Sequence, residues 1–195
     1  MIDFEKLRAL YKFGKEISFS DIQSLIQSAQ RQTFQPGQHL IEAGSEKRIL
    51  FFIHQGLVRV YHVNEKGEEI TTSIVQENGP VASQEVIFFQ RPARFYYQAM
   101  EPTTTLYMDY DVLQNIITTN PKLESSRNKI LLEMFRKSSE RVNAFVLLTP
   151  EERYLQLINE NLDLTNRVPD KYIANILGIT PVSLSRIRKR IASRG

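Results

Sequence analysis

The sequence predicts an α+β fold in which an antiparallel β-roll with flanking helices is followed by one long helix and an all-α C-terminal domain. Three observations indicate this order. Five of the eight glycines fall between residues 37 and 79, where they separate β-rich runs at the spacing of about 8–12 residues that is typical of an antiparallel sandwich or barrel. From residue 121 the apolar residues recur at helical spacing. Residues 169–191 then divide into two short helical segments around one glycine.

Two short helices are expected to open the chain, over residues 4–11 and 22–29, and Ser20 is placed to cap the second. The β-rich runs that follow are residues 49–54, 57–64, 69–76, 94–100 and 104–109. Residues 65–67 have the composition of a hairpin turn. Gly56 joins two runs so directly that a Cβ is not expected to be tolerated there.

One helix of about 25 residues is expected between Pro121 and Thr149, because no glycine or proline interrupts the apolar period there. Such a helix must cover its apolar stripe, either on the β-roll of its own chain or on the same helix of a second subunit. Arg127, Ser138 and Arg141 interrupt the stripe, so it is not a clean heptad seam. We favour a homodimer. The residues expected in the dimer contact are Ile130, Leu131, Met134, Phe135, Val142 and Phe145.

A new helix is expected to begin at Pro150, because Thr149 and Glu152 have the spacing of a capping box and proline suits a first helical turn. A domain junction is therefore predicted at residues 148–150. The expected division is a sensor domain over 1–120, a dimerisation or linker helix over 121–148, and a C-terminal domain over 149–195.

The composition excludes several classes of protein and site. The 195 residues are 42% hydrophobic and 24% charged, which is ordinary for a soluble globular protein. The absence of cysteine excludes disulfides, thiolate metal sites, Fe–S clusters and a thiol nucleophile. No signal peptide and no run approaching the about 18 apolar residues of a membrane span is present. A cytoplasmic protein without membrane contact is therefore expected.

Catalytic and metal-binding patterns are not recognisable. His39, His54 and His62 lack ligand spacing, so no metal site is expected. The sequence has no nucleophile elbow, phosphate-binding glycine loop or acid–base pair within a known motif. An enzyme is therefore not expected.

The charge is concentrated at the C-terminal end. The whole chain has a formal net charge of only +3, but residues 168–195 hold six basic residues against Asp170 alone. This end is therefore +5 and residues 1–167 are −2. Such an asymmetry is expected where one end meets a polyanion, although a solvated basic helix is the alternative on charge alone.

Residues 169–191 have the layout of a helix-turn-helix. Ala174 is small where two helices cross closely, and Gly178 four residues later can adopt the positive φ that the turn needs. Thr180 can cap the second helix, with Pro181 in its first turn. The expected shared core is Ile173, Leu177, Ile179, Leu184 and Ile187.

The second of these helices is predicted to be a DNA-recognition helix, because its exposed face lies beside the basic cluster. Arg186 can pair with a guanine, Val182 can contact a thymine methyl group, and Ser185 can contact a base or a phosphate. Arg188, Lys189 and Arg190 are suited to phosphates. The residues assigned to DNA binding are Thr180, Val182, Ser183, Ser185, Arg186, Arg188, Lys189 and Arg190.

Nearly the whole chain resembles the Crp/Fnr superfamily of bacterial transcription regulators. The motifs are PGQHLIEAG (36–44), LFFIHQGLVRVYHVNEKGEE (50–69) and IANILGITPVSLSRIRKRI (173–191). The resemblance implies a jelly-roll (cupin-like) domain of the cyclic-nucleotide-binding type and a winged helix-turn-helix in which Ser185 and Arg186 match base-contacting positions. It also implies a homodimer on a pseudo-palindromic DNA site, and contact with RNA polymerase. The sequence ends at Gly195, just after the recognition helix, so a shortened wing is expected.

The resemblance is weakest where relatives bind a cyclic nucleotide. Their cassette has Gly-Glu before a short helix and Arg-Ser/Thr-Ala after it, whereas Phe95 follows Arg94 here. Arg91 and Arg94 either bind an anion or are surface arginines on a hairpin around Pro92, and we favour the second interpretation. The residues assigned to an effector pocket are Ser83, Gln84, Glu85, Arg91, Arg94 and Tyr96. Cyclic AMP is not expected, and a small-molecule or nucleotide effector is left unidentified.

The expected function is that of a DNA-binding transcription regulator. The alternative is a ligand-binding or protein-interaction module in which the helix-turn-helix is only structural. DNA binding by the wild-type chain distinguishes the two hypotheses.

Overall fold

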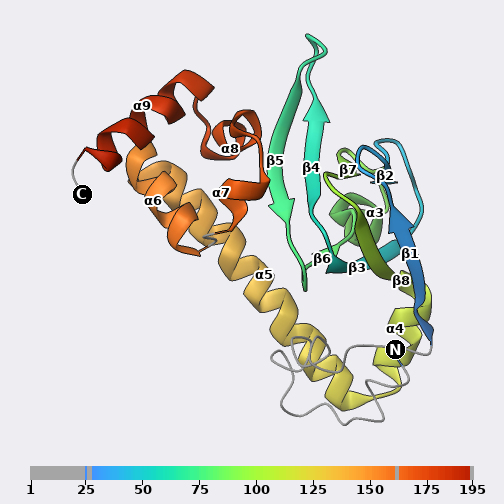
Figure 1. Cartoon of the computed structure of the whole chain (residues 1–195). Coiled ribbons are helices and arrows are strands. Elements are labelled where there is room, and N and C mark those ends of the chain that lie inside the picture. The colour runs from blue at the N-terminus through green and yellow to red at the C-terminus, as the bar shows by residue number, and fades with distance from the viewer. Residues whose placement is uncertain (1–24, 26–27, 161–162, 194–195) are drawn as a thin grey trace. The chain divides into compact units, whose positions relative to one another are not determined.

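The computed structural model describes residue 25, residues 28–160 and residues 163–193 (Figure 1). The chain divides into two compact units, one built from residues 1–62 and 73–133 and the other from 63–72 and 134–195. The predicted helix at 4–11, the Ser20 cap and most of the helix at 22–29 lie outside the described residues, although Leu25 and Ser28 are helical.

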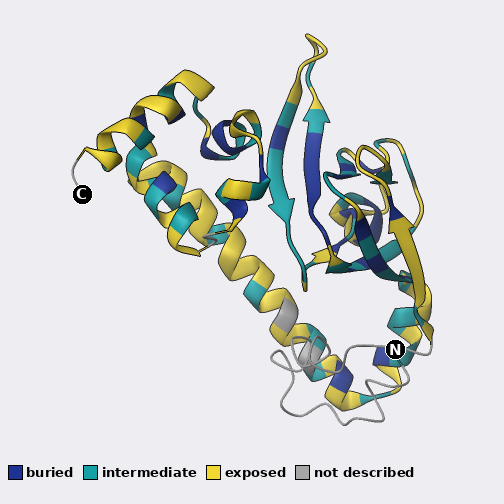
Figure 2. Cartoon of the chain, in the orientation of Figure 1, coloured by how far each residue is buried: buried dark blue, intermediate teal, exposed yellow. Residues whose placement is uncertain are grey.

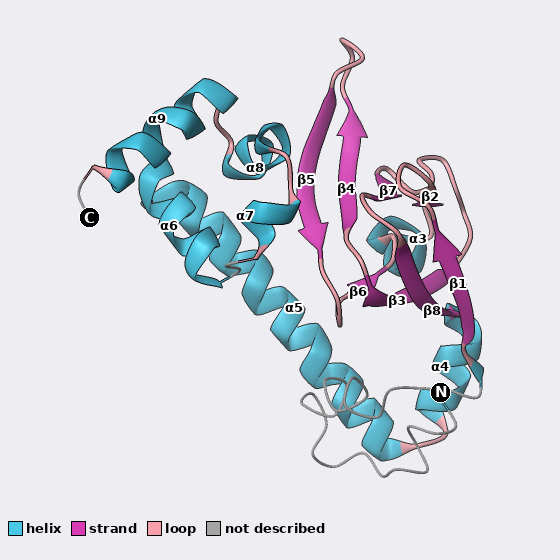
Figure 3. Ribbon diagram, viewed as in Figure 1, coloured by secondary structure: helices cyan, strands magenta, loops and turns pink. Residues whose placement is uncertain are grey.

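The β-strands form two four-stranded sheets rather than a closed barrel (Figure 3). One sheet has the order β1-β8-β3-β6 and the other β2-β7-β4-β5. The strands are β1 (Gln30–Phe34), β2 (His39–Ile41), β3 (Ile49–Gln55), β4 (Val58–Val63), β5 (Glu69–Val75), β6 (Pro80–Val81), β7 (Tyr96–Ala99) and β8 (Thr103–Asp109). The pairs β1–β8, β3–β8, β3–β6, β2–β7 and β4–β7 are antiparallel. Of the two predicted arrangements, the sandwich is therefore the observed one.

The core of the first unit takes apolar side chains from both sheets. Period-2 alternation brings Phe51 and Ile53 of β3 inward, and β4 contributes Val58 and Val60. The Phe34 and Phe51 rings meet edge to face at 5.9 Å between centroids. This packing holds the sheets together without a closed ring of strands.

The turns behave as the glycines predict. Gly56 has φ +104°, and a Cβ there would lie 2.5 Å from Thr103 Oγ1 and 2.7 Å from its Cα. The predicted intolerance of a side chain at this position is therefore confirmed. At the β4–β5 hairpin, the Asn64 amide donates to the Glu68 carbonyl at 3.0 Å, and Gly67 has φ +77°, which confirms the predicted turn.

Several elements were not predicted. These are β1, β2, β6 and the helices α3 (Gln84–Phe89), α4 (Tyr110–Thr118) and α7 (Leu164–Arg167). Strand β1 exposes four of its five residues, so it has no apolar alternation to recognise. Helix α4 carries a readable local signal, because the Asp109 carboxylate accepts from the amides of Asp111 and Val112 at 2.8 and 3.4 Å, as an N-cap does.

The long helix is confirmed as α5 (Pro121–Leu147), which has 27 residues. The boundary between the two compact units falls inside it, between residues 133 and 134. Much of its surface is exposed (Figure 2). None of the described helices has the length and apolar composition needed to cross a membrane.

The second unit contains α6 (Pro150–Glu160), α8 (Asp170–Leu177) and α9 (Pro181–Ala192). Its helix-turn-helix core is as predicted, with Ile173, Ala174 and Leu184 fully buried. Residues 63–72 also belong to this unit, because the Thr71 amide donates to Asn175 Oδ1 of α8 at 3.1 Å. Arg141 of α5 donates to the Thr72 carbonyl.

Candidate nucleic-acid interface

The start of α9 is determined by three adjacent features of the turn. Gly178 adopts φ +68° and ends α8 in the left-handed region. The Thr180 hydroxyl accepts from the Ser183 amide at 3.2 Å, and Pro181 occupies the first turn. The predicted positive φ at Gly178 and the predicted cap at Thr180 are both confirmed. Thr180 and Ser183 also hydrogen-bond to each other at 3.0 Å between their hydroxyl oxygens.

Helix α9 divides into a buried and an exposed face. Leu184 is fully buried and Ile187 is 5% exposed. On the opposite side Val182 is 61% exposed, and Ser185, Arg186 and Lys189 are exposed as well. The four residues at spacing i, i+3, i+4 and i+7 therefore share one surface, as the sequence predicts.

Arg188 is engaged inside the protein. Its Nη1 lies 2.7 and 2.8 Å from the two carboxylate oxygens of Asp170 in α8. Its Nε donates to the Tyr154 hydroxyl of α6 at 3.1 Å. Partial burial acts to lower the pKa of Arg188, but the hydrogen bonds to Tyr154 and Asp170 together raise it above its ordinary value. This arginine thus links three helices of the unit.

Arg190 is also paired within the protein. Its Nη1 lies 2.8 Å from Glu151 Oε2 at the start of α6. Arg186 and Lys189, by contrast, make no ion pair with another described residue. The basic cluster of α9 therefore divides into two arginines that bridge helices and two cations that project outward.

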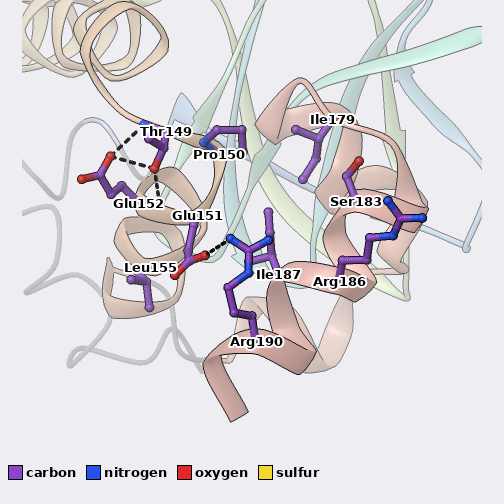
Figure 4. A pocket seen from close by; sticks show the side chains of 10 residues that line it. All are labelled: Thr149, Pro150, Glu151, Glu152, Leu155, Ile179, Ser183, Arg186, Ile187 and Arg190. Carbon is purple, nitrogen blue, oxygen red and sulfur yellow. Dashed lines mark hydrogen bonds and ion pairs between the residues drawn. The ribbon is translucent and has the colours of Figure 1, made fainter. Parts of the chain in front are cut away.

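A groove of about 590 Å³ lies between the start of α6 and the face of α9 (Figure 4). The Glu151–Arg190 ion pair lies on one side, and Ser183 and Arg186 lie on another. Its lining residues are Thr149, Pro150, Glu151, Glu152, Leu155, Ile179, Ser183, Arg186, Ile187 and Arg190. The groove is lined by the carboxylate of Glu151 as well as by the guanidinium groups of Arg186 and Arg190. Because both signs of charge are present, the groove is not a simple anion-binding site.

The predicted capping box at the start of α6 is confirmed. The Thr149 amide and hydroxyl donate to Glu152 Oε2 at 2.7 and 2.8 Å, and the Glu152 amide donates to Thr149 Oγ1 at 3.3 Å. The hydrogen bond from the Thr149 backbone and then that from its side chain hold the pKa of Glu152 below its usual range.

The predicted effector residues before β7 are involved in local structure. The Ser83 side chain is buried, accepts from the Val86 amide at 3.5 Å and donates to Glu85 Oε2 at 3.0 Å. Gln84 is exposed. Burial, with the nearby charge of Glu85, raises the pKa of Tyr97 to about 12, although the Ser83 hydroxyl acts in the opposite direction. Tyr97 was not identified from the sequence, since only the fold brings it to this helix.

The two predicted arginines of this region are exposed. Arg91 and Arg94 lie in the loop between α3 and β7, and the Arg94 guanidinium lies 5.5 Å from the centre of the Phe95 ring. Tyr96 instead stacks on Tyr61 at 5.1 Å between ring centroids. Among the six predicted effector residues, the structure gives a side-chain hydrogen bond only between Ser83 and Glu85.

The buried cation of the first unit was not predicted. Arg59 is 1% exposed, its Nη2 donates to Gln98 Oε1 at 2.9 Å, and its guanidinium lies 3.9 Å from the centre of the Tyr61 ring. The run LVRVYHVN has apolar residues on both faces of the strand, so the sequence does not show which face is buried. It therefore does not show that Arg59 is buried rather than exposed to solvent.

The predicted dimer residues of α5 are largely exposed. Phe135 is 72%, Val142 60% and Phe145 42% exposed, and Leu131 and Met134 are 37% each. The side chain of Ile130 lies outside the described side chains. Three further apolar residues of α5, Leu132, Val146 and Leu147, are 68–76% exposed.

No metal centre is found among the described residues. His, Asp and Glu side chains do not gather in groups of three or more that could hold an ion within residues 28–160 and 163–193.

Comparison with known proteins places this fold. Residues 31–120 match the family model of the cyclic nucleotide-binding domain. Over 183 residues the chain is 25% identical to a fumarate and nitrate reduction regulatory protein of Vibrio cholerae, covering 88% of this chain and 72% of that protein. It is 24% identical over 178 residues to an anaerobic regulatory protein of Pasteurella multocida, covering 85% of this chain and 64% of the relative.

A solved structure extends the likeness to the whole architecture. A CooA variant from Carboxydothermus hydrogenoformans superposes with a TM-score of 0.69 at 20% identity, covering 88% of this chain and 80% of CooA. The matched domain, the relatives named as regulators and the shared arrangement of β-sheets and C-terminal helices lead to one conclusion. Residues 31–120 belong to the cyclic nucleotide-binding domain family, and the chain as a whole is similar to Crp/Fnr transcription regulators.

Proposed function

We propose that the chain binds double-stranded DNA as a homodimer through the exposed face of α9. The observation that carries this proposal is the division of that helix: Arg186 and Lys189 project outward beside Val182 and Ser185, while the opposite face is buried. A helix with this division, following a glycine turn, is suited to enter a major groove. Relatives that match most of the chain are named regulatory proteins.

The outward residues differ in what they can read. Arg186 can donate two parallel hydrogen bonds to a guanine edge, and Val182 can pack on a thymine methyl group. Lys189 is a point charge suited to a phosphate, which positions the helix but carries no sequence information. Arg188 and Arg190 support this surface through Asp170 and Glu151 rather than belonging to it.

The homodimer is proposed to form through α5. This helix exposes several apolar side chains, Phe135 and Val142 among them. Exposure of such an apolar surface to water is unfavourable. Pairing two such helices would cover this surface and give two α9 helices related by two-fold symmetry. Their binding site would then be a pseudo-palindrome with half-sites about one helical turn apart.

The first unit is not proposed to bind a cyclic nucleotide phosphate. The Glu85 carboxylate occupies the first turn of α3, where such an anion would need to lie, and Ser83 donates to it. The exposed side chains of Arg91 and Arg94 do not compensate this charge within the fold. A thermal-shift titration with cyclic AMP is expected to leave the melting temperature unchanged, whereas binding at 100-fold the Kd would add about 2.7 kcal/mol.

Selection from a randomised duplex library, followed by mobility shift at low salt, tests DNA binding. The wild-type protein is expected to enrich a pseudo-palindrome. Arg186→Ala should lose discrimination at one base of each half-site by about tenfold or more, since a bidentate arginine–guanine pair is worth about 1–3 kcal/mol. Arg91→Ala, an exposed arginine of the first unit, is the matched control. Two results would favour the alternative, a ligand-binding or protein-interaction module with a purely structural helix-turn-helix. These are absence of DNA binding by the wild type, and the same affinity and base discrimination in Arg186→Ala as in the wild type.

A further inference from the structure

The junction between α5 and α6 is the point where the proposed dimer helix meets the DNA-binding helices. Helix α5 ends at Leu147 and α6 begins at Pro150. The angle between α5 and α6 is fixed across this short connection only if contacts between the two helices hold them rigidly. The contacts around Arg153 hold them in this way.

The guanidinium of Arg153 in α6 donates hydrogen bonds to backbone carbonyls at the C-terminal ends of two other helices. Its Nη1 donates to the Leu148 carbonyl at 2.7 Å, directly after α5. Its Nε and Nη2 donate to the Leu177 carbonyl, the last residue of α8, at 3.3 and 3.1 Å. Carbonyls at helix ends have no partner within their helix, and a cation there is favourable. One guanidinium therefore donates to one carbonyl at each of the two helix ends.

Phe145 completes the contact from the side of α5. The Arg153 guanidinium lies 4.7 Å from the centre of the Phe145 ring. A Cβ built on Gly178 would lie 2.8 Å from Cε1 of the same ring, so the ring lies against the backbone of the helix-turn-helix turn. Three segments thus meet at one point: the end of α5, the first turns of α6 and the turn before α9.

We propose that Arg153 is a positioning residue that sets the direction of α9 relative to α5, and thereby the half-site spacing that the dimer recognises. This inference rests on the proposed function. In a two-fold dimer a change in the angle at one junction is repeated at the other, so the separation of the two recognition helices responds to both. Contacts within one half-site do not depend on that angle.

The chemistry of arginine is what the junction requires. Its planar fork offers five N–H donors in fixed directions and can hold two carbonyls at once, whereas a lysine offers one mobile ammonium group. Arg153→Lys therefore keeps the charge while releasing at least one helix end. Arg153→Gln removes the charge as well.

The test measures binding to duplexes in which two selected half-sites are separated by the optimal number of base pairs, or by one or two more or fewer, and to a duplex with a single half-site. The wild type is expected to prefer one spacing. Arg153→Lys and Arg153→Gln should lower affinity for that spacing by about tenfold, the effect of one lost charged hydrogen bond, and should flatten the spacing preference. Affinity for the single half-site should change by less than about twofold.

Arg136→Gln is the matched control, because Arg136 pairs with Glu140 within α5. Sedimentation and thermal melting of each variant establish that dimer and fold are kept. An unchanged spacing preference in both Arg153 variants would overturn the inference, and so would an equal loss on the single half-site, which would mean that Arg153 only stabilises the DNA-binding helices. If the wild type binds no duplex at all, the proposed function itself fails, a result distinct from either outcome.

Discussion

At the scale of single residues, Arg188 and Lys189 are neighbours in sequence with different environments. Arg188 bonds to Asp170 and Tyr154, whereas Lys189 is exposed on the outward face. Neighbouring positions on a helix differ by about 100° in direction, so one residue can turn to α6 and α8 while the next turns to solvent. Basic residues in one cluster therefore cannot all be counted as phosphate contacts.

This difference predicts that substitutions of the two residues change the salt dependence of DNA binding differently. Lys189→Gln is expected to reduce the slope of log K against log salt by about 0.9 per subunit, the contribution of one phosphate contact. Arg188→Gln should leave the slope unchanged and lower the free energy of unfolding by about 1 kcal/mol, since its bonds are half-exposed. Mobility shifts between about 50 and 200 mM salt, with urea unfolding of each variant, give both quantities. A reduced slope in Arg188→Gln would contradict this assignment.

Tyr97 predicts how the first unit responds to alkali. Burial raises the pKa of its phenol from 10.0 to about 12, so the neutral form is favoured in the folded state. The resulting stability is present in full below pH 10 and is lost as pH rises from 10 towards 12, by on the order of 2 kcal/mol. Urea unfolding of wild type and Tyr97→Phe measured between pH 8 and 11 tests this. The difference between the two should decrease above pH 10, and a constant difference would contradict the burial argument.

At the scale of elements, the structure shows how helices begin and end through short-range bonds. Thr149 and Glu152 start α6 by reciprocal hydrogen bonds, Thr180 starts α9 and Gly178 ends α8. Each bond joins residues within four positions, which is why the sequence alone predicts these boundaries. Strand β1 has no apolar period and the Ser83 cap of α3 was not recognised in the sequence, so neither element was predicted.

The capping box predicts an acid-sensitive contribution from α6. The pKa of Glu152 is held below its usual 4.5 by its bonds to Thr149, so the stabilisation is present above that value and is lost as pH falls through the lower folded-state value. Wild type should therefore be more stable than Glu152→Gln at pH 7, and the difference should shrink at pH 3. Glu160→Gln, at the far end of the same helix, is the matched control. Equal differences at both pH values would be evidence against the capping role.

At the scale of the whole molecule, the exposed apolar residues of α5 predict the oligomeric state. Phe135→Lys places a charge where the exposed phenyl group is expected to meet its partner, so it should convert a dimer into a monomer because a buried unpaired charge is costly. Sedimentation velocity measures this directly. Asn143→Lys adds the same charge at an exposed polar position of α5 and should leave the dimer intact. A monomeric wild type would refute pairing through this helix.

The sequence by itself determined the order of the β-rich region, the long helix and the helix-turn-helix, together with the glycine turns, the caps of α6 and α9 and the outward face of α9, because each depends on residues a few positions apart. The tertiary structure decided which cations remain outward and which are engaged. Arg188 meets Asp170, Arg190 meets Glu151 and Arg153 meets Leu177 across 18, 39 and 24 positions. Local periodicity carries no information about such partners, since only the packing of whole helices brings a charge and its counterpart within bonding distance.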